Sequence, residues 1–536
     1  MTQLRNSKKY RVEINFKVLK DKFTVDIILA VFISIGLFAL ALYLKQIIGD
    51  WIFSEVVWEY DFLYTSPSGK QTIWYFETYG DADSYYREYL EAFKSGTWNP
   101  YKRNTGRLDF YVYGPIFIYG LWFISLFVGA FNPTNEISIL TRNTVKWTAI
   151  VFDALTVMML YIMVTELKVF KGRRIAKHIF GILAACVLIF APMNLYYIDA
   201  YYLNIPQMTF FTMVSVFLFM KEKYRFSAYF MTLAWLTKQM PLFLLIPMFL
   251  ILMKKENGRF AVKKFLFPFL ISSFLVSIPW IFITPHLYLI RIFGAGRPLY
   301  NLILGEAGRP YGVTLAHSFQ HLGIEPIAKF YFYINFPMIP FIFFYVLSIL
   351  VSHFNAKKIS EDETNFVVYI TWFFVLSHTF ISRGLFKYYD AFFSPFLILT
   401  ALLLLEKTIQ IYQEEKISEE IEIPEDEYSK KILLEYYFKS AFFDLVLLIT
   451  FLSSIIIIYY YQWVIMITIR YLHPMLLLVM FLILSAFFPI SFYKSLFVSD
   501  NYTQFENDVK SIYPIIKTEL IYTWKKIVRK VKKESS

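Results

Sequence analysis

Long apolar runs, separated by shorter polar and charged segments, dominate this chain of 536 residues. A transmembrane helix needs about 20 mainly apolar residues, and runs near that length recur along the whole sequence. The runs that fit this pattern cover residues 24–46, 145–167, 176–196, 205–220, 226–237, 240–253, 265–284, 327–351, 366–382, 389–405, 441–461 and 474–492. We therefore expect an all-α, polytopic transmembrane helical protein with twelve spans, one for each run.

A further apolar run, residues 111–131, decides how the spans are oriented. Lys and Arg accumulate on the cytoplasmic side of membrane proteins, so the basic residues within 5–22 assign the N-terminus to the inside. If 111–131 crossed the membrane, the five cations from Lys168 to Lys177 would lie outside. If it lies along the outer interface, or dips in and returns, every later basic loop falls inside, with 36 of the 53 Lys and Arg residues. This second arrangement predicts a multi-pass protein of the cell membrane with both termini cytoplasmic.

The same topology divides the chain into segments with different expected roles. In order, these are a cytoplasmic basic N-terminus (1–23), a transmembrane module (24–405) with outer loops at 48–144 and 285–326, a cytoplasmic charged insert (406–440), two C-terminal spans (441–495) and a cytoplasmic basic tail (496–536). The insert is rich in Glu and is expected to be a solvated loop. In the tail, apolar and basic residues recur at helical spacing from Ile512 onward. That pattern is typical of a helix on an anionic membrane surface, which makes membrane lipids expected partners.

Composition and charge agree with membrane residence and exclude other classes. Hydrophobic residues make up 57% of the chain and aromatic residues 21%, with a mean hydropathy of +0.49, which excludes a set of soluble domains. The net charge of +12 is explained by the cytoplasmic basic loops, so we expect no nucleic-acid partner. Cys186 is the single cysteine, which excludes an intrachain disulfide.

A pair of carboxylates, Asp81 and Asp83, is the first candidate for chemistry, because it lies in the expected outer loop just before a helical stretch. Two carboxylates at this spacing can cap a helix, accept a proton from a hydroxyl group, or hold a divalent cation. The pair alone leaves these three interpretations open. A nucleotide sugar is not normally supplied to the outer face, so a sugar donor there would have to be linked to a lipid.

Three motifs in this loop carry a resemblance to a known family. They are Asp81-x-Asp83-x-Tyr85, then Ser95-Gly96 ending in Pro100-Tyr101, then Tyr111-x-Tyr113-Gly114-Pro115 before an apolar helix. The arrangement resembles the first outer loop of the polytopic GT-C glycosyltransferases, especially the polyprenyl- and dolichyl-phosphate-mannose-dependent mannosyltransferases. Further matches are Arg142, Asp153, residues 237–241 with Pro247, and residues 378–395. The resemblance covers roughly residues 24–405. It departs from the family at Gly114, where many members have a second proline.

The resemblance implies a GT-C-like catalytic module whose active site faces the outside. The implied reaction is an inverting displacement, in which an acceptor hydroxyl attacks the anomeric carbon of a polyprenyl-phosphate sugar. The implied donor carries a hexose, with mannose expected, and the acceptor is a lipid- or protein-linked glycan. Asp81 is implied as the base, and Asp83 as the second choice or as a metal or acceptor contact. No cofactor is implied with certainty, and a divalent cation stays open.

Such a site needs cations near the lipid phosphate and polar groups near the sugar. The candidate phosphate ligands, at the outer ends of spans and in the second outer loop, are Lys238, Arg383 and Lys387, followed by Arg291, Arg297 and Arg309. His378 is a candidate donor to the phosphate or the sugar. The candidates for sugar hydroxyls are Asp199 and Asn204, and the matched motifs add Gln239 and Tyr113 as substrate-binding residues.

Each candidate also has a structural interpretation. Lys and Arg at span ends commonly extend to lipid head groups, and Asp153 could pair with a neighbouring helix instead of a ligand. His317 and His321 have metal-ligand spacing if they are helical, but no adjacent Cys or Asp completes a site. Two other functions remain as alternatives to the enzyme. One is a transporter or flippase for a lipid-linked substrate, and the other is a non-catalytic assembly protein.

Overall fold

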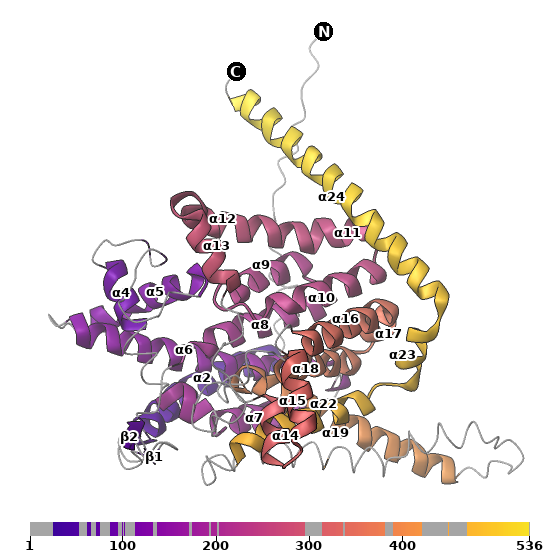
Figure 1. Cartoon of the computed structure of the whole chain (residues 1–536), viewed down its shortest axis with the longest axis horizontal. Helices are drawn as coiled ribbons and strands as arrows, with labels where there is room; N and C mark the ends of the chain where they lie inside the picture. Colours follow the sequence, from indigo (N-terminus) through magenta and orange to yellow (C-terminus); the bar gives the residue numbers. More distant parts are fainter. Residues whose placement is uncertain are drawn as a thin grey trace, which may run out of the picture.

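The computed structural model describes residues 25–52, 62–65, 71–74, 86–94, 99, 101, 113–131, 137–170, 174–191, 194–200, 203–294, 314–335, 338–380, 390–420, 449 and 469–534. This part of the chain is almost entirely helical (Figure 1). The helices of its first half are α2 (Val25–Trp51), α4 (Arg87–Lys94), α5 (Pro115–Phe131), α6 (Ile137–Thr165), η3 (Lys168–Phe170), α7 (Arg174–Ile189), η4 (Asn194–Ala200), α8 (Ile205–Met220), α9 (Tyr224–Trp235), α10 (Leu242–Lys255) and α11 (Gly258–Ala261).

The second half continues in the same way. Its helices are η5 (Val262–Leu266), α12 (Phe267–Ile283), α13 (Pro285–Gly294), α14 (Leu315–His321), α15 (Glu325–Asn335), α16 (Ile339–Phe354), α17 (Ala356–Glu361), α18 (Glu363–Phe380), α19 (Asp390–Glu420), α22 (Ile469–Ala486), α23 (Ile490–Lys494), η9 (Ser495–Phe497) and α24 (Ser499–Glu534). The helical class expected from the hydrophobic pattern is therefore correct for this part of the chain.

One small element differs from the all-helical expectation. Strands β1 (Phe62–Thr65) and β2 (Gln71–Trp74) pair antiparallel, with Phe62 opposite Trp74 and Thr65 opposite Gln71. Both strands are rich in aromatic and β-branched residues, which favour extended backbone. The hairpin belongs to the first predicted outer loop, outside every apolar run.

The lengths of the described helices limit which of them could span a membrane. Three are long and apolar enough, Asp26–Trp51, Asn143–Thr165 and Gly258–Ile283, and two bent helix pairs raise the number to five. Other apolar helices have 10–17 residues. At 1.5 Å per residue, helices of 12–16 residues are roughly 18–24 Å long, against a hydrocarbon core of about 30 Å. Helices that could cross a membrane are present, and the count of twelve spans remains a prediction.

Prolines explain the two bent pairs. The expected span 327–351 consists of α15 and α16, which meet at 69°. Pro340 lies in the first turn of α16, at this break, and proline disfavours helical backbone in the residue before it. Similarly, α22 ends before Pro489, and the following helical segment turns by 92°. Apolar composition continues across both breaks, so hydropathy alone cannot reveal them.

Ion pairs between described residues follow the two sides assigned from the sequence. On the side assigned to the outside, the pairs are Lys45 with Asp153 and Asp199, Lys146 with Asp50, and Lys329 with Glu325. On the side assigned to the cytoplasm, pairs from different segments are Lys177 and His178 with Asp26, Lys168 with Glu363, Lys221 with Glu166, Lys255 with Glu222, Lys254 and His353 with Asp508, and Arg259 with Glu519. No ion pair within the described residues joins the two sets.

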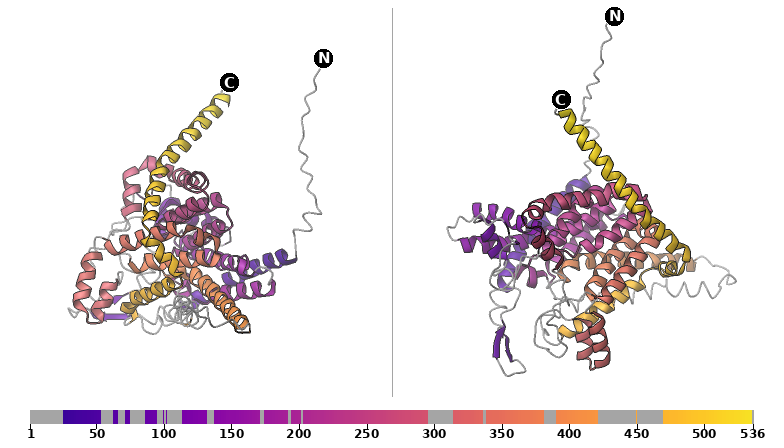
Figure 2. Two further views of the ribbon diagram at one scale, coloured as in Figure 1. Left: turned by 90° about the vertical axis from the view of Figure 1, so that its right-hand side faces the viewer. Right: turned by 45° about the horizontal axis from the view of Figure 1, so that its top comes forward.

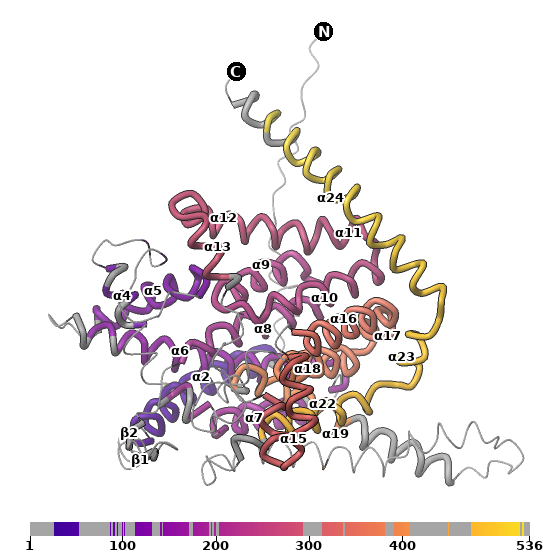
Figure 3. Tube along the Cα trace, in the orientation of Figure 1, coloured from indigo at the N-terminus to yellow at the C-terminus, as the bar shows by residue number. Residues whose placement is uncertain are grey.

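The C-terminal helix α24 crosses the ends of several other helices, near α11 and α17 (Figures 1 and 3). It is held there by partly buried Phe505, Ile512 and Ile516, and by the ion pairs of Asp508 and Glu519. Its distal part extends beyond the other helices (Figure 2). The helix expected in the tail is therefore present.

Candidate functional site

Lys238 is the candidate phosphate ligand that the structure describes best. It lies in the turn between α9 and α10, and only 8% of the residue is exposed. Its ammonium nitrogen is 3.3 Å from Oδ1 of Asn204 and 5.8 Å from the centre of the Tyr113 ring. An aromatic face and an amide oxygen both stabilise a cation. Three candidates from distant parts of the sequence therefore lie in one place.

A close backbone contact explains why Tyr113 reaches this lysine. The nitrogen of Ile116 donates to the carbonyl oxygen of Leu236, at 3.1 Å, two residues before Lys238. A Cβ added to Gly114 would lie 1.9 Å from that same oxygen. Only glycine fits here without movement of the backbone. Proline also carries a Cβ, so glycine at position 114 is a structural requirement of this chain.

Tyr86 and Tyr101 connect the first outer loop to the same place. The hydroxyl groups of Tyr86 and Tyr113 are 3.5 Å apart, and the Tyr101 hydroxyl donates to the Tyr113 carbonyl at 3.0 Å. The amide of Asn99 donates to the hydroxyl oxygen of Thr284 at 3.0 Å, next to α12. In the sequence, Tyr101 belongs to the family-like motif that ends in Pro100-Tyr101. Tyr86 belongs to no such motif, and only its position shortly after Asp81 and Asp83 could have indicated a role.

His378 lies fully buried in the last turn of α18, beside the Phe392 and Phe393 rings. Its Nδ1 is 2.8 Å from the carbonyl oxygen of Phe374, which can only accept a hydrogen bond. In the neutral ring Nδ1 therefore carries the proton and Nε2 is an acceptor. Lys238 is close enough to act electrostatically on this imidazole. Donation by Nε2 to a phosphate or a sugar would require the protonated ring, and the role of His378 stays a prediction.

The remaining candidates separate into three groups. Gln239 donates to the carbonyl oxygen of Ile292 at 3.1 Å, so it connects this turn to α13, which also carries the half-buried candidate Arg291. Asp199 lies in a second cluster, described next. The rest lie outside the described residues or have side chains that are not described, and these are Asp81, Asp83, Arg142, Arg297, Arg309, Arg383 and Lys387. Their roles stay predictions.

The second cluster joins α2, α6, η4 and α19 through buried polar groups. The Lys45 ammonium contacts carboxylate oxygens of Asp153 and, at 3.2 Å, of Asp199. Asn194 donates to Asp153 at 3.0 Å and accepts from Ser394 at 3.1 Å. Asp153 thus pairs with a neighbouring helix, which was its structural interpretation. Lys45 was missed, although it is the only basic residue in the run 24–46 and a charge at that depth is a signal for function.

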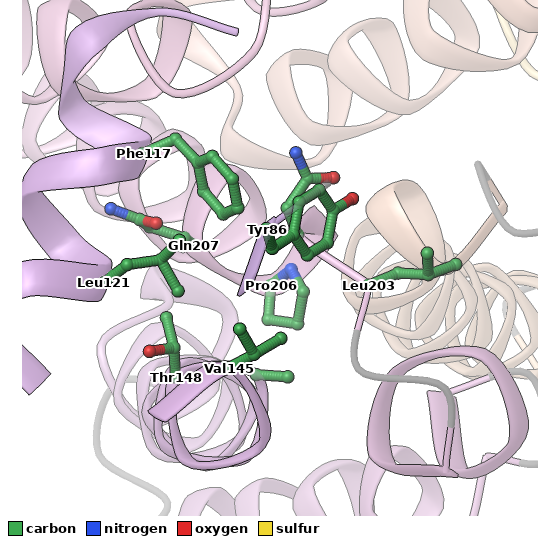
Figure 4. A pocket seen from close by; sticks show the side chains of 10 residues that line it. Tyr86, Phe117, Leu121, Val145, Thr148, Leu203, Pro206 and Gln207 are labelled. Atoms are coloured by element: carbon green, nitrogen blue, oxygen red, sulfur yellow. The ribbon is translucent and has the colours of Figure 1, made fainter. Parts of the chain in front are cut away.

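A narrow pocket lies beside Asn204, between α5, α6 and the start of α8 (Figure 4). It has about 220 Å³ of empty space including the part open to solvent, and its enclosed part is about the size of one water molecule. Most of its walls are apolar. The lining residues are Tyr86, Phe117, Leu121, Val145, Thr148, Ala149, Leu203, Asn204, Pro206 and Gln207.

Of the two histidines with metal-ligand spacing, His317 and His321, the first has a structural role at the start of a helix. Nδ1 of His317 accepts from the backbone nitrogen of Thr314 at 3.2 Å, at the N-terminus of α14. Within the described ranges, no group of three or more His, Cys, Asp or Glu side chains could hold a metal ion. A cation at Asp81 and Asp83 stays an open prediction.

Comparison with known proteins gives no assignment, since no protein-family model matches the chain and no curated protein matches its sequence. The functional argument therefore depends on the residues themselves.

Proposed function

We propose that this chain is a membrane glycosyltransferase of the GT-C type. It transfers a hexose, expected to be mannose, from a polyprenyl-phosphate sugar to a lipid- or protein-linked acceptor on the extracytoplasmic face. The acceptor hydroxyl oxygen attacks the anomeric carbon and its proton passes to Asp81. The bond between that carbon and the phosphate oxygen breaks, and the lipid phosphate leaves with the electron pair, stabilised by Lys238.

One observation carries the proposal. The buried ammonium of Lys238 contacts Asn204 and Tyr113, and Tyr113 contacts Tyr86, which follows Asp83 by three residues. Three residues of chain span at most roughly 11 Å. The described residue that follows the family-like carboxylates therefore lies near a cation suited to a phosphate, and this supports the proposed displacement.

The division of the ion pairs supports the proposed twelve-span topology. Spans of alternating direction bring helix ends of one side together, and charged residues at those ends then pair only with one another. The pairs of Lys45 and Lys146 on one side, and those of Lys177 and Lys254 on the other, follow this rule. Under this topology Lys238, Asn204 and Tyr113 all lie at the outer face.

The cluster around Lys45 favours a second candidate function, a transporter or flippase for a lipid-linked substrate. Charged groups buried at membrane depth are costly and often mark ion or substrate pathways. In proteoliposomes, a transporter would move a labelled polyprenyl-phosphate sugar between leaflets and form no new glycoside, whereas the enzyme forms one.

The test is transfer of labelled mannose from polyprenyl-phosphate mannose by the purified full-length protein, compared with Asp81→Asn and Lys238→Met. Loss of the base should reduce the rate by about 10²–10⁴-fold, and loss of the cation by about 10²–10³-fold. Lys329→Met is the matched control, because that side chain is 65% exposed and pairs only within its own helix among the described contacts. Undiminished transfer by Asp81→Asn would refute the assigned base.

A further inference from the structure

The tail helix α24 is held against the rest of the protein by its acidic residues. The carboxylate of Asp508 contacts the Lys254 ammonium at 2.6 Å and Nε2 of His353 at 3.0 Å. Lys254 lies in the last turn of α10, and His353 lies in the last turn of α16. Farther along the tail, Glu519 pairs with Arg259 of α11 at 3.1 Å. One side chain, Asp508, therefore joins α24 to two other helices.

His353 is enclosed by this contact. Only 2% of the residue is exposed, and the ring of Phe505, from α24, has its centre 4.9 Å from the centre of the imidazole. An ionised carboxylate can only accept, so Nε2 carries the proton when the ring is neutral. Nδ1 is buried and has no hydrogen-bond partner among the described residues. The tail thus covers a histidine of which only one nitrogen is paired.

The charges of this contact balance only while His353 is neutral. The same oxygen, Oδ2 of Asp508, contacts both Lys254 and His353. The carboxylate already compensates the ammonium group, so a proton on the imidazole adds an excess positive charge beside it. That proton would be carried by Nδ1, and a buried donor without a partner is unfavourable. Protonation of His353 is therefore opposed by the docked helix.

Other charged groups do not change this balance. The remaining helices packed against α16 are α15, α17, α18, α23 and η9. Among the described residues, they bring no charged group to the imidazole, and only Lys254 and Asp508 act on it electrostatically. The apolar contacts of Phe505, Ile512 and Ile516 hold α24 equally at every pH, because these side chains do not titrate. The histidine is thus the group that makes this contact depend on protons.

The sign of the pH dependence follows from the surroundings of His353. This residue lies outside the expected span 327–351. Burial and Lys254 lower its pKa below the usual value of 6.5, while Asp508 opposes them. When α24 leaves, water reaches the ring and the pKa returns toward that value. Docking is therefore strongest above pH 6.5. It weakens as the pH falls below that value, by at most about 10-fold per pH unit for one proton.

We propose that His353 is a pH-sensitive latch for the tail, so that acidification on the side of the tail releases α24 from α10 and α16. The latch is independent of the proposed transfer reaction. Failure of the latch leaves that reaction unaffected, and failure of the reaction leaves the latch unaffected.

The experiment follows the position of α24 while the pH is lowered from about 8 to about 5.5. Spin labels are attached at Ser511→Cys on α24 and at Lys357→Cys on α17, both exposed positions, in full-length protein that also carries Cys186→Ala. With His353 intact, the single short distance between the labels should be replaced by a broad distribution as the pH falls. Helix content, measured by circular dichroism, should stay constant, because only the docking of α24 changes.

Two variants separate proton uptake from a structural role. His353→Gln keeps a donor for Asp508 and cannot titrate, so α24 should stay docked over the whole pH range. Lys254→Met removes the competing cation, so the imidazolium and the carboxylate pair alone, and acidification should no longer release the helix. His286→Gln, at an exposed position on α13, is the matched control and should respond to pH like the parent.

Three results overturn the latch. The first is an unchanged distance between the labels over the whole pH range. The second is release of α24 in His353→Gln at the parent's midpoint, which assigns the pH dependence to another group. The third is loss of helix content together with release, which means that the protein unfolds. If His353→Gln fails to dock at any pH, the response of Lys254→Met decides, and release on acidification in that variant also overturns the latch.

Discussion

Replacing Lys45 by methionine should destabilise the protein strongly, because it leaves two carboxylates in the interior. Lys45, Asp153 and Asp199 are each at most 1% exposed. Removing one partner of a buried ion pair typically costs about 3–5 kcal/mol, since the remaining charge stays desolvated. The two acids are also held near each other, so the upper part of that range is expected.

The charge count of the cluster makes the prediction sharper. It contains two carboxylates and one ammonium group, and Oδ1 of Asp199 has no partner among the described residues. A buried excess charge is relieved when one carboxyl group takes up a proton. Asp199→Asn should therefore cost less than about 1 kcal/mol, because it removes the excess negative charge and keeps a neutral group of the same shape. The triple variant Lys45→Met, Asp153→Asn, Asp199→Asn should recover most of the loss.

The assay is thermal unfolding in detergent, followed by a dye that reacts with thiols. Cys186 is the only cysteine and is half-buried in α7, so it reports when that helix is exposed. The control is Lys146→Met, whose pair with Asp50 is partly exposed and should contribute at most about 1 kcal/mol. The reasoning is refuted if Lys45→Met melts with the wild type, or if Asp199→Asn melts as low as Lys45→Met.

Two further predictions concern the approach of the first outer loop and the tail. Gly114→Ala should displace Tyr113 from Lys238, because the added Cβ would lie 1.9 Å from a backbone oxygen. Transfer should become more than 10-fold slower, which corresponds to about 1.4 kcal/mol. The control is Gly36→Ala, which should transfer at the wild-type rate because an added Cβ there has nothing within 4 Å. The second prediction is that the basic tail helix lies on an anionic membrane surface. A fluorescent label is placed on Trp524→Cys, a position that is 67% exposed, in protein that also carries Cys186→Ala. Spin-labelled lipid should quench this label in anionic nanodiscs and much less in neutral ones. Equal quenching in both would contradict the electrostatic part of that expectation.

Short-range patterns in the sequence determined much of the secondary structure. The run 205–220 coincides with α8, because apolar composition is a property of consecutive residues and needs no knowledge of neighbours. The breaks near Pro340 and Pro489 were readable in principle, since proline limits the backbone locally. The hairpin of β1 and β2 was not expected, because strands of four residues carry too little periodicity to be recognised.

The sequence by itself determined that the chain has apolar helices that could span a membrane, the approximate positions of many helices, and a set of candidate residues for the proposed donor site. Only the tertiary structure decided which of these residues meet. Lys45 pairs with Asp153 across 108 residues of sequence, and Lys238 meets Asn204 across 34. It also placed Asp199 beside Lys45 and Asn204 beside Lys238, in two different clusters. The physical reason is that a charge or amide buried among helices is defined by its partners, and those partners come from packing between distant segments, which a single sequence does not display.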